Sequence, residues 1–123
     1  MVTPLAGRRV LLVEDDYFLA DEMCRTLEGA GAEVVGPVGR VEEAIGLIND
    51  AEHLDAALLD VNVHDVMITP VADLLRQRAV PFCFATGYDQ AAMPERHADA
   101  RRLEKPVEAT VVVREILRLI DGE

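Results

Sequence analysis

The sequence predicts an α/β fold in which helices cover both faces of a five-stranded parallel sheet, a doubly wound arrangement. Short aliphatic runs alternate along the chain with segments whose apolar residues recur at helical spacing. The aliphatic runs lack the polar–apolar alternation of half-exposed strands, which indicates strands buried on both faces. Connections of this length between parallel strands are right-handed crossovers. The length of 123 residues corresponds to one domain over positions 1–123.

The first two strand–helix pairs follow from this periodicity. A buried strand is expected over 8–14, followed by a helix from Asp16 to about Gly29. Asp16 is the expected N-cap, because an aspartate side chain there accepts hydrogen bonds from the first backbone N–H groups of a helix. A second strand over 33–38 and a helix that begins near Val41 complete this half of the chain.

The second half repeats the alternation. Strands are expected over 55–60, 80–85 and 100–104, and a final helix over 107–120. Thr69 and Pro70 are typical of an N-cap and a first helical residue, and that helix should end near Arg76 and Arg78. The sequence between the fourth and fifth strands contains Pro94 and has little room for a helix. We therefore expect the segment 88–99 to be a shortened or irregular fourth helix that can switch conformation.

Composition excludes several classes of function. Twelve Lys and Arg against 23 Asp and Glu give a net charge of −11, which repels phosphate backbones, so no nucleic-acid partner is expected. No apolar run approaches the roughly 20 residues of a membrane helix and no signal peptide opens the chain, so we expect a cytoplasmic protein without membrane contact. Cys24 and Cys83 are predicted to be buried free thiols. His53, His64 and His97 share no ligand-like spacing and are expected on the surface.

Polar residues gather where the predicted strands end. Glu14 and Asp15 follow the first strand, Asp60 ends the third, Thr86 follows the fourth and Lys105 follows the fifth. In an open parallel sheet, ligands bind outside the carboxyl ends of the strands, at the point where strand order reverses. With a strand order of 2-1-3-4-5, that point lies between the first and third strands. We therefore expect these side chains to converge on one cleft.

The chemistry of such a cleft is specific. Carboxylates held close together repel one another unless a cation or a proton intervenes. Oxygen ligands with open positions suit Mg²⁺. A carboxylate can attack a phosphoryl group to form an aspartyl phosphate, and the transferring group then needs a metal on one side and a fixed cation such as Lys105 on the other. The sequence therefore predicts Mg²⁺-dependent phosphorylation, with Thr86 available as a hydrogen-bond donor.

Four short motifs make the chain resemble the receiver domains of bacterial response regulators, the family of two-component signalling. They are Val-Leu-Leu-Val-Glu-Asp-Asp at 10–16, Leu-Leu-Asp-Val-Asn at 58–62, Ala-Thr-Gly at 85–87 and Glu-Lys-Pro at 104–106. The resemblance covers essentially the whole chain and implies the flavodoxin-like receiver fold. It also implies that Asp60 accepts a phosphoryl group from a histidine kinase or a histidine phosphotransfer protein.

The resemblance assigns roles to the other residues of the cleft. For the metal site beside Asp60, it implies direct binding of Mg²⁺ by Asp15, waters oriented by Glu14, and a contact from the backbone carbonyl of Asn62. Thr86 would sense the phosphoryl group and Lys105 would pair with it. The Lys105–Pro106 peptide is often cis in the family, which would aim the lysine into the cleft.

Within the family, the stretch Pro-Phe-Cys-Phe-Ala-Thr-Gly-Tyr at 81–88 resembles the FAT GUY receivers, single-domain regulators typical of alphaproteobacteria. Two positions depart from the usual receiver pattern. Arg102 stands where most receivers carry the aromatic residue that rotates with the threonine, and Tyr88 is our hypothesis for its substitute. His64 stands where a proline usually follows the phospho-acceptor by four residues, so this loop is expected to be more mobile or differently aimed.

Three functions remain open from the sequence. The leading hypothesis is a phosphorylation-dependent switch, not a turnover enzyme. It signals through an unknown downstream protein or drains phosphate from a kinase. We expect the sequence to be a complete gene product, because it ends just after the last helix. The alternative is a degenerate receiver that acts as a constitutive interaction module, as His64 and Arg102 would favour. The third hypothesis is a phosphatase-like enzyme with Asp60 as the nucleophile. Such an enzyme would need a carboxylate at position 62 as general acid, and the asparagine there argues against it. The wide apolar face of the last helix predicts core packing or a dimer contact.

Overall fold

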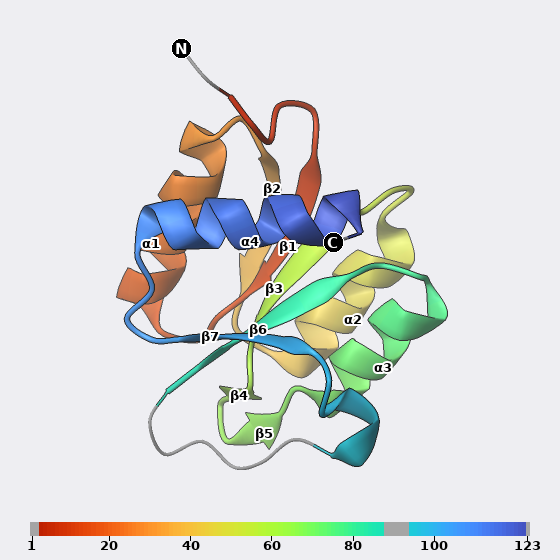
Figure 1. Ribbon diagram of the computed structural model, residues 1–123. Helices are drawn as coiled ribbons and strands as arrows, with labels where there is room; N and C mark the ends of the chain where they lie inside the picture. Colours follow the sequence, from red (N-terminus) through yellow and green to blue (C-terminus); the bar gives the residue numbers. More distant parts are fainter. Residues whose placement is uncertain (1–2, 88–93, 123) are drawn as a thin grey trace.

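The structure, a computed structural model, describes residues 3–87 and 94–122. It contains a five-stranded sheet whose strands lie in the order β2-β1-β3-β6-β7. The strands are β1 (Arg9–Val13), β2 (Glu33–Val38), β3 (Ala56–Asp60), β6 (Phe82–Thr86) and β7 (Arg101–Glu104). Every pairing between neighbours is parallel. Counted along the chain, this is the predicted order 2-1-3-4-5, which confirms the doubly wound fold (Figure 1).

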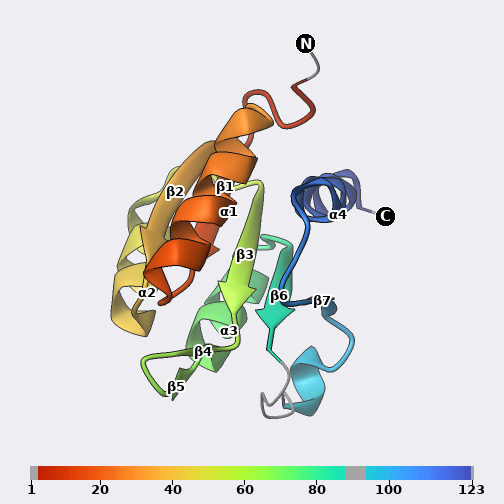
Figure 2. The same cartoon turned by 90° about the vertical axis from the view of Figure 1, so that its left-hand side faces the viewer.

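Four helices cover the sheet in two pairs: α1 (Tyr17–Gly29) and α4 (Ala109–Asp121), and α2 (Val41–Asp50) and α3 (Thr69–Gln77). Each pair shares a hydrophobic core with one face of the sheet, and Figure 2 shows α4 standing apart from α2 and α3. Along β1, Leu11 and Val13 belong to the core under α2 and α3, whereas Val10 and Leu12 belong to the core under α1 and α4. The strand is therefore buried on both faces, as its unbroken apolar run predicts. Among the described residues, no helix is long and apolar enough to cross a bilayer.

Two outer strands, β2 and β7, close the sheet at its sides. In β2, Gly36 has a φ of +101°, and a Cβ there would lie 2.9 Å from the carbonyl oxygen of Leu12. The register of β1 against β2 shifts at this point, between Leu11 and Val13. Glycine is therefore needed where β2 approaches β1 most closely.

The two predicted helix caps have different outcomes. Asp16 is the N-cap of α1, and its Oδ1 accepts hydrogen bonds from the N–H groups of Phe18 and Leu19 at 3.0 and 3.1 Å. The predicted cap at Thr69 is wrong, because Ile68 is the N-cap of α3 and Thr69 is already helical. Ile68 is fully buried and its N–H donates to the carbonyl of Val61 at 2.8 Å. Core packing, and not a capping side chain, therefore decides where α3 begins.

The loop after β3 folds into a hairpin that the sequence analysis did not predict. Strands β4 (Asn62–Val63) and β5 (Val66–Met67) pair antiparallel around a two-residue turn at His64 and Asp65. Both turn residues are left-handed, with φ of 49° and 63°, as in a type I′ turn. Such turns favour Asn-Gly or Asp-Gly, so the dipeptide His64-Asp65 does not predict a hairpin from the sequence.

The connection between β6 and β7 is short, as predicted. Within its described part, residues 94–100, it holds a single 3₁₀ turn, η1 (Glu95–His97). Residues 88–93, and with them Tyr88, lie outside the described part of the chain. That this segment can switch conformation stays a prediction.

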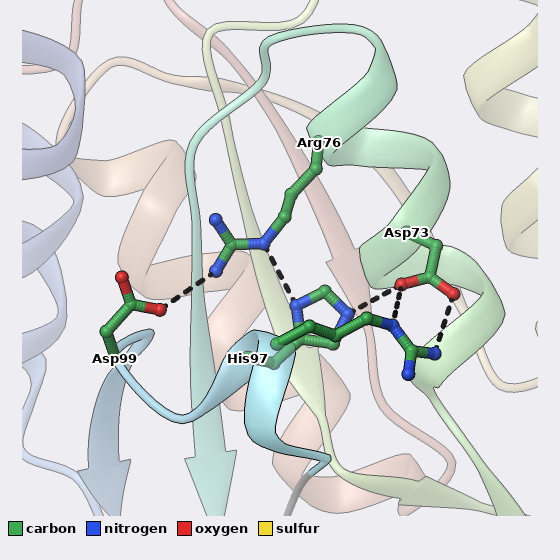
Figure 3. A network of polar contacts seen from close by, with 5 residues as sticks. Asp73, Arg76, His97 and Asp99 are labelled. Carbon is green, nitrogen blue, oxygen red and sulfur yellow. Dashed lines mark hydrogen bonds and ion pairs between the residues drawn. The ribbon is translucent and has the colours of Figure 1, made fainter.

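One histidine prediction is wrong: His97 is fully buried, whereas His53 and His64 are exposed as expected. Figure 3 shows the imidazole of His97 between two residues of α3. Its Nδ1 accepts a hydrogen bond from Nε of Arg76 at 2.9 Å, and its Nε2 lies 2.7 Å from Oδ1 of Asp73. Both ring nitrogens of His97 therefore have a polar partner on α3. The ring also meets Phe82 and Phe84 of β6 edge to face.

Two further ion pairs complete this cluster, which we call the His97 network (Asp73, Arg76, Arg96, His97 and Asp99). Arg96 binds Asp73 through two hydrogen bonds of 2.9 and 3.0 Å, and Arg76 reaches Asp99 at 3.4 Å (Figure 3). The hydrogen bonds from Arg96 are the main cause that lowers the pKa of Asp73 to about 2; burial opposes them, and the hydrogen bond to His97 adds to them. The network therefore connects residues 96–99, which precede β7, to α3.

The remaining predictions concern the cysteines and the last helix. Both cysteines are free, as predicted, but only Cys83 is buried and Cys24 is half-buried on α1. Burial raises the pKa of Cys83 to about 12, so this thiol stays protonated. On α4, Val112 and Ile116 are buried, and the flanking apolar residues Val113 and Leu117 are half-buried. The helix therefore packs mainly into the core, and a dimer contact through it stays a prediction.

Candidate functional site

Three carboxylates meet at the carboxyl edge of the sheet. Glu14 directly follows β1, Asp60 ends the adjacent strand β3, and Asp15 follows Glu14. One carboxylate oxygen from each of the three lies within 4.8 Å of the others. Glu14 and Asp60 are buried and Asp15 is exposed. The parallel topology thus brings together residues 45 positions apart, as the strand-end argument predicted.

Lys105 enters the same cluster from the loop after β7, where the Lys105–Pro106 peptide is cis. Its Nζ lies 2.9 Å from Oε2 of Glu14 and 3.3 Å from Oδ2 of Asp60. The lysine side chain is only 16% exposed, so the ammonium is largely withdrawn from water between two buried carboxylates. Such a desolvated pair is strongly held, because removing either partner would leave a buried charge.

The electrostatics of the cluster are unbalanced, with three carboxylates against one ammonium among these residues. Burial raises the pKa of Glu14 to about 7; Lys105 opposes the rise and the charge of Asp60 adds to it. For Lys105, burial alone would lower the pKa, but the contacts with Glu14 and Asp60 outweigh burial and raise it above its usual value. The ionised form of Glu14 is therefore disfavoured by burial and by Asp60, whereas the charged form of Lys105 is favoured by its two carboxylate partners.

Thr86 lies at the end of β6 and is half-buried. In the pairing of β3 with β6, Asp60 stands opposite Ala85, so Thr86 lies one residue beyond the end of β3. The carbonyl of Thr86 accepts a hydrogen bond from the backbone N–H of Lys105 at 2.8 Å. The structure thus places Thr86 at the same edge of the sheet as the acidic cluster, next to the lysine in the backbone ladder.

Asn62 begins the β4–β5 hairpin, two residues after Asp60. The pair next to a two-residue turn, Val63 and Val66, exchanges hydrogen bonds, so the pair Asn62 and Met67 does not. The backbone carbonyl of Asn62 is therefore not used by the ladder of the hairpin. This leaves it available for the metal contact that the family resemblance implies.

The structure adds one contact that sequence reasoning missed. The backbone N–H of His64, at the tip of the hairpin, donates to Oδ2 of Asp15 at 2.8 Å. The departure from proline at position 64 marked this loop as unusual, but nothing in the sequence indicated the turn or its partner. Arg102, at the position of the missing aromatic residue, is exposed on β7 opposite Phe84.

The donor set of the cluster fits a divalent cation. The ligand atoms on offer are carboxylate oxygens from Glu14, Asp15 and Asp60, with the Asn62 carbonyl nearby. Magnesium takes one or two carboxylates, keeps several waters and also accepts phosphate oxygens, which suits a cluster with one exposed member. The absence of sulfur and imidazole from the cluster argues against a zinc site.

No protein-family model matches the chain. Among solved structures, it is similar to SdrG from Sphingomonas melonis Fr1, at 34% identity and a TM-score of 0.77, covering 89% of this chain and 95% of SdrG. SdrG has also been solved in a BeF3-activated conformation. A CheY-like response regulator receiver domain protein from Methanospirillum hungatei JF-1 is 25% identical with a TM-score of 0.80, covering 94% of each chain.

A similar curated protein is the transcriptional regulatory protein PdtaR of Mycobacterium tuberculosis, 29% identical over 94 residues. That match covers 76% of this chain and 45% of PdtaR. The chain spans less than half the length of the curated relatives it matches.

Proposed function

Because the chain belongs to the response-regulator receiver family, we propose that it accepts a phosphoryl group on Asp60 and acts as a phosphorylation-dependent switch in a two-component system. The donor is a histidine kinase or a histidine phosphotransfer protein. One observation carries the proposal: Asp60 is buried at the carboxyl edge of the sheet with Lys105 3.3 Å away and two further carboxylates within 4.8 Å. The BeF3-activated conformation of the similar protein SdrG supports it.

The transfer itself is a displacement at phosphorus. A carboxylate oxygen of Asp60 attacks the phosphorus of a phosphohistidine, the P–N bond breaks, and the imidazole leaves with its electron pair and takes up a proton. A Mg²⁺ ion held by Asp15, Asp60 and the Asn62 carbonyl, with waters oriented by Glu14, would supply positive charge to the phosphoryl oxygens. Lys105 already lies beside Asp60 and would pair with the same oxygens. The Thr86 hydroxyl would donate to one of them.

The output of the switch follows from the added charge. A phosphoryl group adds negative charge and three acceptor oxygens to a cluster that is already short of positive charge. Thr86 and the segment after it would reorder around that group, and the new surface would be recognised by a downstream protein. We propose one receiver domain over 1–123, cytoplasmic, of the FAT GUY subtype, which signals through protein contacts or acts as a phosphate sink rather than turning over a substrate.

The test is intact mass after incubation with Mg²⁺ and acetyl phosphate. We expect a single phosphoryl adduct on the wild type, none on Asp60→Ala, and an unchanged adduct on the control Asp50→Ala, which removes an exposed aspartate of α2. Loss of the adduct on omission of Mg²⁺ would support the metal site.

An adduct on Asp60→Ala would contradict the assignment of the acceptor. No adduct on the wild type, from acetyl phosphate or from any phosphohistidine donor, would favour the alternative, a constitutive interaction module. One observation favours this alternative: the exposed Arg102 stands where most receivers carry an aromatic residue.

A further inference from the structure

The β4–β5 hairpin is attached to the acidic cluster at both of its ends. At its base, Asn62 follows Asp60 after a single residue, and its carbonyl is not used by the hairpin ladder. At its tip, the backbone N–H of His64 donates to Oδ2 of Asp15 at 2.8 Å. A short element of six residues, 62–67, therefore connects the strand that carries the phospho-acceptor with the exposed carboxylate of the cluster.

The turn of this hairpin adopts a conformation that its residues do not favour. His64 and Asp65 both carry a Cβ and both have a positive φ, of 49° and 63°. Left-handed backbone is uncommon for residues other than glycine, although His and Asp tolerate it better than most. The buried residues Val63 and Ile68, and the hydrogen bond from Ile68 to Val61, hold the base of the hairpin. At the tip, the contact with Asp15 holds the turn.

The members of the cluster are oriented in different ways. Glu14 receives hydrogen bonds from Lys105, at 2.9 and 3.2 Å, and from the N–H of Asp16 at 3.3 Å. Asp60 lies 3.3 Å from the same ammonium. Asp15 is exposed, and the contact that orients its carboxylate is the amide of His64. In metal sites, donors of this kind fix the direction of a ligating carboxylate, and their loss lowers metal affinity by about 10- to 100-fold.

We propose that the β4–β5 hairpin is a positioning element for the cation site. The backbone N–H of His64 holds the Asp15 carboxylate toward Glu14 and Asp60. The closed hairpin, in which this hydrogen bond is formed, thereby sets the affinity for a divalent cation. The inference rests on the proposed function, because it requires the acidic cluster to bind such a cation. The role belongs to the backbone of His64 and not to its imidazole, which is exposed. Because linkage is reciprocal, a bound cation must in turn stabilise the closed hairpin.

The first experiment measures Mg²⁺ affinity by titration of ¹⁵N-labelled protein, following backbone amide shifts. His64→Asn keeps the amide and suits a left-handed turn, so we expect wild-type affinity. His64→Pro removes the N–H and fixes φ near −65°, which opens the turn, so we expect affinity about 10- to 100-fold weaker. Unchanged shifts of the β1 and β6 amides would confirm that the variant is folded.

A second measurement needs no variant and keeps the inference testable if His64→Pro does not fold. In the wild type, hydrogen exchange of the His64 amide should slow when Mg²⁺ saturates the site. The Gly122 amide at the C-terminal end of α4 exchanges by local fraying and, as a control, should not respond.

Three outcomes would overturn the inference. Equal Mg²⁺ affinity of folded His64→Pro and wild type would do so while leaving the metal site itself intact, as would unchanged or faster exchange at His64 on Mg²⁺ binding. No binding of Mg²⁺ by the wild type would overturn both the inference and the metal-dependent part of the proposed function.

Discussion

Two clusters of charged and polar side chains contain buried members: the acidic cluster at the carboxyl edge of the sheet, where Glu14 and Asp60 are buried, and the His97 network beside α3, where the imidazole is buried. In the network, two carboxylates face two guanidinium groups, and both ring nitrogens of His97 have a polar partner. In the acidic cluster, three carboxylates face the single ammonium of Lys105. The network is complete as it stands, whereas the cluster keeps an excess of negative charge.

The balance of charge separates a cluster that holds two segments together from a cluster that binds a ligand. A buried polar group contributes to stability when its partners match it in number and charge, and it costs free energy when they do not. The His97 network is matched, so its role is to hold the segment before β7 against α3. The acidic cluster is not matched within the chain, so a cation and a phosphoryl group are the partners that complete it. Neutralising one carboxylate should therefore raise the stability of the protein in the acidic cluster and lower it in the His97 network.

The largest effect is expected from His97→Ala. Removing a fully buried ring leaves a cavity beside Phe82 and Phe84 and an unpaired donor on Arg76, so we expect the free energy of unfolding to fall by about 3 kcal/mol. Urea denaturation measures it. The control Glu52→Ala removes an exposed side chain and should stay within about 0.5 kcal/mol of the wild type. A loss below 1 kcal/mol for His97→Ala would contradict the fastening role.

A smaller effect, confined to the acidic cluster, is expected from Mg²⁺. At a concentration 10- to 100-fold above its dissociation constant, the ion should stabilise the wild type by about 1.4 to 2.7 kcal/mol, and EDTA should reverse the effect. Asp15→Ala should lose most of this gain, whereas His97→Ala should keep it. Thermal unfolding with and without Mg²⁺ provides the measurement, and equal stabilisation of the Asp15 variant would exclude Asp15 as a ligand.

Neutralising one carboxylate in each cluster should have opposite signs. Without metal, Asp60→Asn removes one of the two carboxylates that lie near Glu14, and we expect stability to rise by up to about 1 kcal/mol. Asp73→Asn removes the partner of Arg96 and should lower stability by a similar amount. The urea midpoints of both variants are compared with that of the wild type in EDTA. A shift of both midpoints in the same direction would contradict the distinction between the two clusters.

The smallest effect concerns the pH dependence of the network. Hydrogen bonds from Arg96 lower the pKa of Asp73 to about 2, so its contribution to stability is present above the ordinary pKa of an aspartate and is lost as pH falls through about 2. The side chain is 40% exposed, and screening by water therefore limits the contribution to below about 1 kcal/mol. The advantage of the wild type over Asp73→Asn should vanish between pH 4 and pH 2 in thermal unfolding. A constant advantage over this range would contradict the role of the charge.

The sequence was sufficient where local patterns decide the structure. The five strands and the cap at Asp16 follow from apolar periodicity and from the chemistry of one side chain, whereas the strand order is what the resemblance to receiver domains implies. The cluster of Glu14, Asp15 and Asp60 follows from the parallel topology, which brings strand ends together whatever lies between them. Lys105 was predicted in the same way, because its motif follows the last strand.

The predictions that failed depend on contacts between distant segments. The burial of His97 requires α3 and β6 to enclose a residue more than ten positions away along the chain. Thr69 has the composition of a cap, but the packing of Ile68 moves the start of α3 by one residue. The contact between His64 and Asp15 joins residues 49 positions apart through a turn of atypical composition. In each case tertiary packing overrides a local preference.

The two outer strands of the sheet have a consequence for how the protein meets other copies of itself. An exposed edge offers unpaired N–H and carbonyl groups on which a further strand can align, the first step toward fibrillar aggregation. Here β7 presents Arg101, Arg102 and Glu104, and β2 contains Pro37, which has no N–H to offer. Charge on one edge and proline on the other both oppose strand addition. Strand addition is thus opposed at both edges of the sheet.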